Sequence, residues 1–262
     1  MDGLGQVLRR DRAVIGGGVA FAAATAWAYT LYEAKRMSVA GVCECAGMKM
    51  GGPDLTSWSL ESFLPLFAMW SVMMLAMMLP TAAPMLLTFA SVARNRRRAD
   101  RPYVSVAVFA AGYLTIWCLF SVIAAIAQWI LHRVALLSPM MTTSSALLAG
   151  WLLLIAGIFQ FTPLKNSCLR RCRAPLEFIM TRWREGWRGA LGMGIEHGAF
   201  CAGCCWALMA LLFVLGVMNI LWIAILTIIV ALEKMLPRVQ WFSAASGCAF
   251  LLWGTWVLAA NV

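Results

Sequence analysis

The sequence contains few charged residues and almost no histidine. Of its 262 residues, 12% are charged and two are histidine, whereas 63% are hydrophobic. Soluble globular domains have an apolar share of about one half, so this composition excludes an ordinary soluble domain. The sequence also has no Walker-type loop and no dinucleotide-binding fingerprint, which excludes the nucleotide chemistry that depends on them. What remains is the composition of a polytopic membrane protein.

Apolar segments long enough to cross a bilayer, about 20 residues each, recur along the chain. We expect an all-α fold with about seven transmembrane helices, or six if the closely spaced fifth and sixth segments merge. The whole chain, 1–262, then forms a single transmembrane domain whose first span is retained. The expected spans are 14–32, 60–90, 103–132, 144–163, 189–217, 218–236 and 240–260.

Positive charge is concentrated in alternate connections between these spans. Of the 21 Lys and Arg residues, 17 lie before the first span, in 94–101, in 165–188 or near 234–238. By the positive-inside rule these segments face the cytoplasm, so the N-terminus is cytoplasmic and the C-terminus is outside. The net charge of +10 therefore predicts orientation in the lipid bilayer, and no nucleic-acid partner is expected.

We expect the chain to lie in the inner membrane of a bacterium. The orientation assigns sides to the two longest connections. Segment 33–58 is expected to be an extracytoplasmic loop rich in Cys and Met, and segment 164–188 a basic cytoplasmic loop.

The fifth expected span combines a histidine with thiols. His197, Cys201 and Cys204 occur at i, i+4 and i+7 and therefore share one narrow face of a helix. Such residues bind soft metal ions, so this stripe, with Cys205 and the intramembrane carboxyl of Glu196, predicts a metal site. A ridge of small residues beside the stripe would let another helix approach closely. The ridge residues are Ala190, Gly194, Gly198 and Ala202.

The second expected span is rich in methionine. Most methionines fill apolar cores, and that interpretation stays open here. Pro80 and Pro84 are expected to break this helix where thioethers and freed carbonyls face a cavity. We predict that some of four methionines lie near the His–Cys stripe and complete the site with it. They are Met73, Met74, Met77 and Met78.

Two further sulfur groups are candidate secondary metal or redox sites. The outside segment carries Cys43, Cys45, Met48 and Met50, which suit either capture of a soft metal or a disulfide in an oxidising compartment.

The basic connection carries Cys168 and Cys172, whose neighbouring arginines favour thiolates suited to transient metal exchange. A positive-inside loop that merely contains cysteine is the alternative.

Glu233, near the end of the sixth expected span, is expected to pair with Lys234 or a loop arginine at the cytoplasmic surface.

Four ordered motifs resemble a bacterial family of uncharacterised membrane proteins, described as predicted metal-binding and copper chaperone-like. The resemblance covers roughly residues 60–240 and implies a metal-binding integral membrane protein. The motifs are Met73–Pro80 (MMLAMMLP), Gln160–Lys165 followed by Cys168-x3-Cys172-Arg173-x-Pro175, Gly203-Cys204-Cys205-Trp206, and Met218-Asn219 leading to Glu233-Lys234.

The leading hypothesis is a membrane protein that binds and relays a soft metal, Cu(I) before others, by transfer and not by enzymatic catalysis. A copper donor or acceptor protein would be its partner. One alternative is a transmembrane thiol–disulfide redox protein using Cys201-x-x-Cys204. Another is an accessory or assembly subunit of a copper-dependent membrane oxygenase.

Overall fold

The computed structural model describes residues 2–45, 60–98, 105–133, 145–236 and 240–260, and these residues form helices with no strand among them. The helices are α1 (Asp2–Cys45), α2 (Leu60–Arg98), α3 (Val106–Arg133), α4 (Ala146–Gln160), α5 (Pro163–Arg173), α6 (Pro175–Arg182), α7 (Gly186–Ala210), α8 (Leu212–Leu215), α9 (Ile220–Met235) and α10 (Gln240–Ala259).

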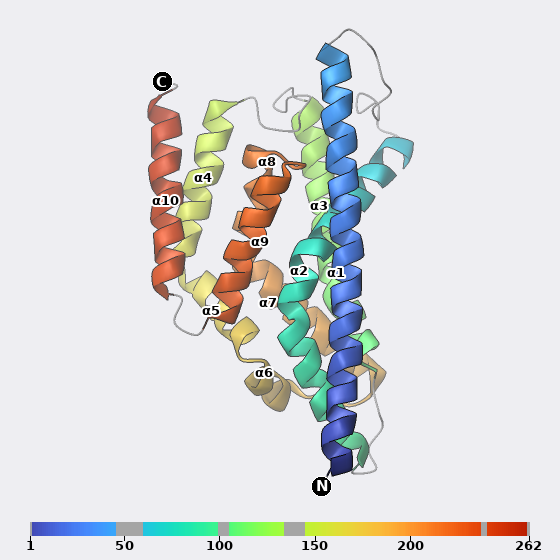
Figure 1. Ribbon diagram of the computed structural model, residues 1–262. Coiled ribbons are helices and arrows are strands. Elements are labelled where there is room, and N and C mark those ends of the chain that lie inside the picture. Colours follow the sequence, from blue (N-terminus) through green and yellow to red (C-terminus); the bar gives the residue numbers. More distant parts are fainter. Residues whose placement is uncertain (1, 46–59, 99–104, 134–144, 237–239, 261–262) are drawn as a thin grey trace.

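The long helices stand side by side and alternate in direction. In Figure 1, α1, α3, α7 and α10 run from the lower end to the upper end, and α2, α4 and α9 run back. The N-terminus lies at the lower end and the C-terminus at the upper end. Arg96 near the end of α2 pairs with Glu185 just before α7 at 2.5 Å, which joins two of the basic connections at the lower end.

Five of the described helical segments are long and apolar enough to cross a membrane, or six if the bent pair formed by α4 and α5 counts as one span. The all-helical, polytopic prediction is confirmed. The sixth expected span corresponds to α9, whose 16 residues fall short of the roughly 20 that a full crossing needs. The five segments are Ala13–Met37, Ser62–Arg96, Val106–Arg133, Gly186–Leu215 and Trp241–Ala259.

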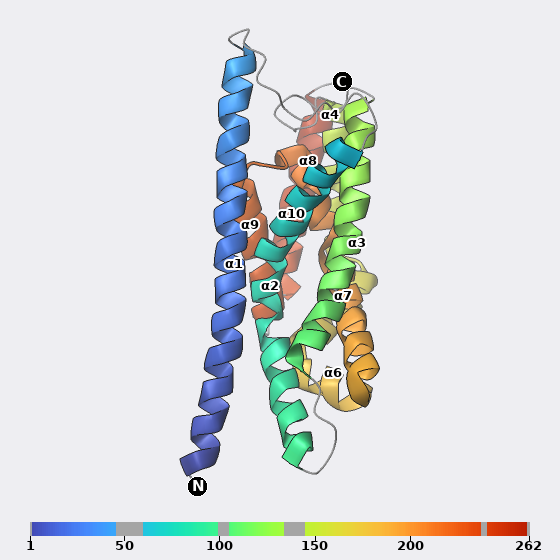
Figure 2. The same cartoon turned by 90° about the vertical axis from the view of Figure 1, so that its right-hand side faces the viewer.

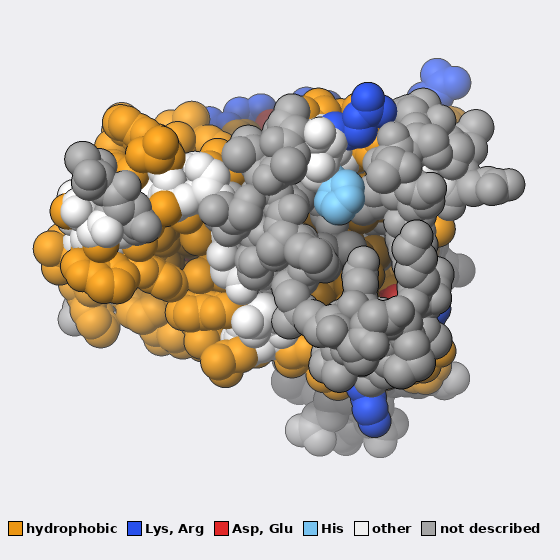
Figure 3. Space-filling model, turned by 90° about the horizontal axis from the view of Figure 1, so that it is seen from above, with side chains coloured by type: hydrophobic (Ala, Val, Ile, Leu, Met, Phe, Trp, Pro, Cys, Tyr) orange, Lys and Arg blue, Asp and Glu red, His pale blue; other side chains and the backbone are white. Residues whose placement is uncertain are grey.

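The outer surface of the bundle is apolar. Figure 2 shows α1 along the outside of α2, and in Figure 3 hydrophobic side chains dominate the side where Figure 1 places α4 and α10. Trp151 on α4 and Leu252 and Trp256 on α10 are more than half exposed. Because hydrocarbon tails, not water, suit such side chains, this surface fits a lipid environment.

The closest helix contact joins α3 to α7. A Cβ atom on Gly194 would lie 2.1 Å from the carbonyl oxygen of Phe109, and one on Gly112 would lie 2.3 Å from that of Leu191. Glycines on both helices thus permit backbone contact. The expected small-residue ridge does receive a neighbouring helix, which is α3, because its Gly112 complements Gly194.

The expected break in the second span is absent. The helix α2 continues through Pro65, Pro80 and Pro84 without interruption. Hydroxyl groups supply extra bonds in this region, since Thr81 donates to the carbonyl of Met78 at 2.8 Å and Thr88 donates to that of Pro84 at 2.7 Å. These are ordinary bonds of hydroxyl side chains to a carbonyl one turn earlier in the helix.

The turn between the fifth and sixth expected spans is as tight as predicted. The helix α8 ends at Leu215, Gly216 adopts a φ of 96°, and α9 begins at Ile220. Asn219 caps α9 by accepting a hydrogen bond from the backbone N–H of Trp222. Gly216 matters here because a positive φ is strained for residues with a side chain.

The segment expected as a basic loop is mostly helical. Thr162 caps the start of α5 by accepting from the N–H of Lys165, and Pro163 occupies the first turn, where its missing N–H needs no partner. Pro175 then starts α6 after Ala174 interrupts the helix. The helix α5 therefore packs against α7 and α9, and its two cysteines are partly buried against the core.

Candidate metal centre

Four cysteine thiols meet where α7 packs against α5. Cys201, Cys204 and Cys205 on α7 are at most 2% exposed, and the partly buried Cys172 of α5 lies next to Cys201 and Cys204. The thiols of Cys204 and Cys205 also donate to the Cys201 carbonyl at 3.1 and 3.0 Å. We call these four residues the thiol cluster. The sequence predicted three of them as one site but assigned Cys172 to a separate loop.

The ammonium group of Lys234 lies against the thiol cluster. From α9, its Nζ is 2.9 Å from the Sγ of Cys201, 3.3 Å from the Oγ1 of Thr81 and 3.8 Å from the Sδ of Met78. A buried cation needs a compensating charge or hydrogen bonds, and this position supplies sulfur and oxygen partners. Lys234 is thus part of this cluster of polar groups. The sequence did not indicate this role, because it suggested a pair between Lys234 and its neighbour Glu233.

Glu233 pairs with Lys165, not with Lys234. The Nζ of Lys165 is 2.7 Å from the Oε2 of Glu233 and also donates to the side chain of Gln160. Arg173 donates to the Glu233 carbonyl at 2.6 Å. The expected surface pairing of Glu233 is wrong because successive helical residues point about 100° apart, so Glu233 faces α5 while Lys234 faces α7. This buried pair ties α5 to α9 beside the thiol cluster.

Tyr113 connects α2, α3 and α7 at the thiol cluster. Its hydroxyl is 3.1 Å from the Sγ of Cys201 and donates to the Met78 carbonyl, also at 3.1 Å. Tyr113 immediately follows Gly112, so the close approach of α3 to α7 brings this hydroxyl to Cys201. A single tyrosine in an apolar span gave no sequence signal for this role.

The methionines of α2 point into the protein and not toward lipid. Met73, Met74, Met77 and Met78 are each 0% exposed and belong to the same hydrophobic core as the thiol cluster. Met78 is linked to the thiol cluster indirectly, because its thioether lies 3.8 Å from the Nζ of Lys234. Met73, Met74 and Met77 share the core, where filling space is the ordinary role of methionine.

His197 lies one helical turn before Cys201, in an aromatic surrounding. Its ring centroid is 5.7 Å from those of Tyr113 and Phe178 and 6.1 Å from that of Phe109. His197 is 3% exposed, and its Nδ1 atom has no hydrogen-bond partner in the described part of the chain. A buried ring nitrogen without a partner retains a free site for a proton or a metal ion.

Glu196 points away from the thiol cluster. Its two carboxylate oxygens pair with Arg182 at 2.6 Å and with Arg184 at 3.3 Å. These pairs join α7 to the segment around the end of α6. Glu196 therefore forms ion pairs with two arginines. The sequence had grouped it with the cysteines of the candidate site.

Cys168 lies between the thiol cluster and the surface. It is partly exposed on α5, four residues before Cys172, and its Sγ would be 3.1 Å from a Cβ atom on Gly203. The absence of a side chain at Gly203 thus lets Cys168 lie against α7. Because residues i and i+4 share a helix face, α5 carries two thiols in line toward the buried cysteines.

Side-chain rotation is needed before the thiol cluster can ligate an ion. Across the described residues, no three or more His, Cys, Asp or Glu side chains are arranged so that they could hold a metal ion. Cys204 and Cys205 instead turn their thiols to a backbone carbonyl, and Lys234 occupies the adjoining space. The donor set of thiols with a thioether nonetheless suits a soft ion.

The candidate residues of the segment expected outside the cytoplasm do not have described side chains. Cys43 and Cys45 fall in the last turn of α1, with side chains outside the described part, and Met48 and Met50 are not among the described residues. Their proposed roles as a secondary metal or redox site therefore stay predictions from the sequence.

Helical packing and an apolar outer surface define the chain as a polytopic helical membrane protein, and its interior contains buried sulfur groups. Residues 67–257 match the family model of PpoB2, described as copper chaperone. The chain belongs to this family, which confirms the resemblance drawn from the motifs. Searches of curated proteins and of solved structures found no match.

Proposed function

We propose that the chain binds Cu(I) at the thiol cluster and relays it between the membrane interior and the end of the bundle that carries α5. The observation that carries this proposal is the meeting of four cysteines from two helices with a thioether and a buried ammonium group. Thiolate and thioether ligands select Cu(I) over hard cations. Membership of a copper chaperone family supports the same metal.

Lys234 would balance the charge of the loaded site. A copper(I) ion held by two thiolates carries one negative charge, which is unfavourable in an apolar interior. The Nζ of Lys234, 2.9 Å from Cys201, supplies the opposite charge. Ion, ligands and lysine together are then neutral, so the site can hold copper at membrane depth.

Cys168 and Cys172 would pass the ion along α5. Cys168 is partly exposed, and Cys172 contacts the thiols of Cys201 and Cys204. Stepwise exchange between neighbouring thiolates moves a soft ion without releasing it into hydrocarbon. A copper donor or acceptor protein, including a membrane oxygenase, would dock where Cys168 meets the surface.

The elemental composition of protein purified anaerobically in detergent tests this proposal. We expect bound copper and free thiols, and we expect C172S, C201S and C204S each to lower the copper content about tenfold or more, because serine is a poor ligand for soft metals. C118S and C248S are matched controls, since both cysteines are exposed elsewhere on the bundle. Equal copper in all five variants contradicts the proposal.

A thiol–disulfide redox function is the second candidate. The contact between Cys172 and both Cys201 and Cys204 favours it, since a disulfide could form between helices. It leaves Met78 and Lys234 without a role. Protein that contains no copper and has two fewer free thiols before reduction than after it would select this function.

We further propose that the lower end of the bundle in Figure 1 faces the cytoplasm of a bacterium across its inner membrane. The basic connections at that end support this orientation. Cysteines introduced at Lys49 and Arg133 should react with an impermeant thiol reagent in intact cells, and those at Arg97 and Arg184 should not. The opposite labelling would reverse the orientation.

A further inference from the structure

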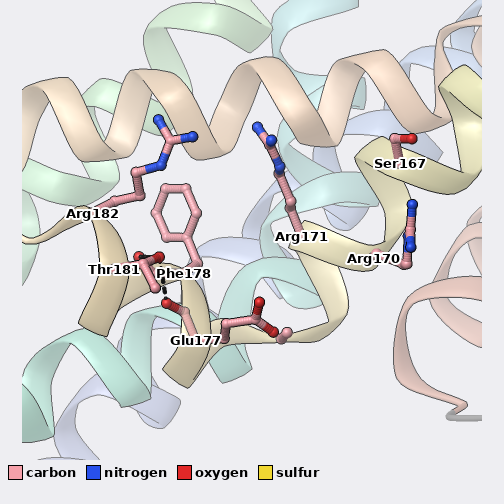
Figure 4. Close-up of a pocket in the computed structure, with 8 residues that line it drawn as sticks. Ser167, Arg170, Arg171, Glu177, Phe178, Thr181 and Arg182 are labelled. Atoms are coloured by element: carbon pink, nitrogen blue, oxygen red, sulfur yellow. Dashed lines mark hydrogen bonds between the residues drawn. The ribbon is translucent and has the colours of Figure 1, made fainter.

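A pocket of about 620 Å³ opens between α5 and α6 at the lower end of the bundle, and none of its lining residues belongs to the thiol cluster. Its lining is mainly polar and includes three arginines. Figure 4 shows the side chains of Arg171 and Arg182 extending past the ring of Phe178 in the same general direction. The lining residues are Ser167, Arg170, Arg171, Ala174, Glu177, Phe178, Thr181 and Arg182.

The pocket carries an excess of positive charge. Arg170 and Arg171 form no ion pair with any described carboxylate, and Arg171 instead lies over the ring of Phe200 at 4.3 Å. Arg182 shares Glu196 with Arg184, and Glu177 is the acidic side chain of the lining. Arg170 and Arg171 therefore leave positive charge in the pocket beyond the Arg182–Glu196 pair, which favours an anionic ligand, and guanidinium groups match phosphate oxygens in geometry.

The two helices that form this pocket also carry exposed apolar side chains. Leu164 on α5 and Leu176 and Met180 on α6 are each about 60% exposed, at 61, 59 and 64%. Leu176 and Met180 are four residues apart and share one face of α6. A short helix with an exposed apolar face beside a basic surface is typical of helices that lie at the membrane interface, with the apolar face among acyl chains.

We propose that this pocket binds the headgroup of an anionic phospholipid, with its phosphodiester held by Arg170, Arg171 and Arg182 and its acyl chains along the apolar face of α6. The hydroxyl groups of Ser167 and Thr181 lie in the same lining, and the Glu177 carboxylate accepts hydrogen bonds from headgroup hydroxyls such as those of phosphatidylglycerol. Phosphate and acyl chain are recognised together, which distinguishes this ligand from free phosphate. The bound lipid would fix α5 and α6 at the interface beside Cys168.

Native mass spectrometry of the full chain in detergent, titrated with phosphatidylglycerol, phosphatidylcholine and inorganic phosphate, tests this proposal. We expect saturable binding of phosphatidylglycerol, weaker binding of the zwitterionic phosphatidylcholine, and none of inorganic phosphate at equal concentration. The double variant R170Q/R171Q should raise the dissociation constant for phosphatidylglycerol about tenfold, as the loss of charge-assisted hydrogen bonds predicts.

The double variant R184Q/R188Q is the matched control, because it removes the same charge near the same end of the bundle without touching the pocket lining. It should change the dissociation constant by less than about twofold. An equal loss in both double variants indicates unspecific attraction and overturns the proposal. So does inorganic phosphate that binds as tightly as the lipid. The single variant R170Q provides the same comparison if the double variant does not fold.

Discussion

The helices α7 and α2 carry the two halves of the predicted site, and the structure uses them differently. The cysteines of α7 contact one another, α5 and Lys234 directly. The methionines of α2 are equally buried, yet their link to the thiols runs through the thioether and carbonyl of Met78. The burial of a sulfur-rich helix face therefore indicates a candidate metal site less strongly than direct contacts of its sulfur atoms with one another and with other polar groups.

The reason for the difference is the choice of neighbouring helix. The glycines of α7 admit α3, which has a glycine of its own at the contact, and α2 has no such residue there. The backbone contact places Tyr113 between α2 and Cys201. Four predictions follow this comparison, from the packing of α7 to the charge pairs at its end.

The largest effect is expected from Gly194→Ala. The added Cβ atom would lie 2.1 Å from the Phe109 carbonyl oxygen, so α3 and α7 must separate, at a cost of about 2 to 3 kcal/mol. Thermal unfolding in detergent, followed by circular dichroism, measures the loss. Gly192→Ala is the matched control on the same helix, because its Cβ atom meets only a flexible arginine end at 3.3 Å. Equal unfolding temperatures for the two variants would show that the helices are not in backbone contact.

The second prediction concerns Lys234→Leu. Leucine keeps an apolar volume but removes the ammonium group beside Cys201, so the loaded site would keep an uncompensated charge. We expect the dissociation constant for Cu(I) to rise about tenfold or more in competition with a chromophoric chelator. Thr81→Val removes another partner of Lys234 and leaves its charge, and it should have a smaller effect. Unchanged affinity in Lys234→Leu would remove the lysine from the site.

Met78→Leu separates ligation from packing on α2. Leucine and methionine have similar volumes, so stability should change by less than about 1.5 kcal/mol. We expect the affinity for Cu(I) to fall several-fold, roughly threefold to tenfold, because the thioether near Lys234 is lost. Met73→Leu, at an equally buried position, should leave the affinity unchanged. The same loss in both variants would extend the site along α2, as the sequence alone predicted.

Sequence periodicity correctly placed three side chains of the candidate site inside the bundle. The spacing of His197, Cys201 and Cys204 put them on one face, and each is buried. Apolar segments and basic connections likewise predicted the helices and their alternating directions. These features are local, because each depends on residues within one helix or at its ends.

The remaining parts depend on contacts between distant segments. Cys172 reaches the site because α5 folds back against α7, and Lys234 reaches it because Glu233 is drawn to Lys165 on the other side of α9. The period of a helix indicates which face is buried, not which neighbour it meets. A basic segment that contains cysteines is typical of a solvated loop. The capping pattern of Thr162 and Pro163 is the local signal that indicates a helix here.

The smallest effect is expected from Glu196→Gln, which tests whether this carboxyl is a metal ligand or a partner of arginines. Its pairs with Arg182 and Arg184 are partly exposed, and such pairs contribute less than about 1 kcal/mol. We expect copper affinity within about twofold of the unmodified chain, since the carboxylate faces away from the sulfur ligands. Glu185→Gln is the control, because it removes a similar pair with Arg96 at the same end. A tenfold loss of affinity confined to Glu196→Gln would return this residue to the ligand set and require α7 to rotate on loading.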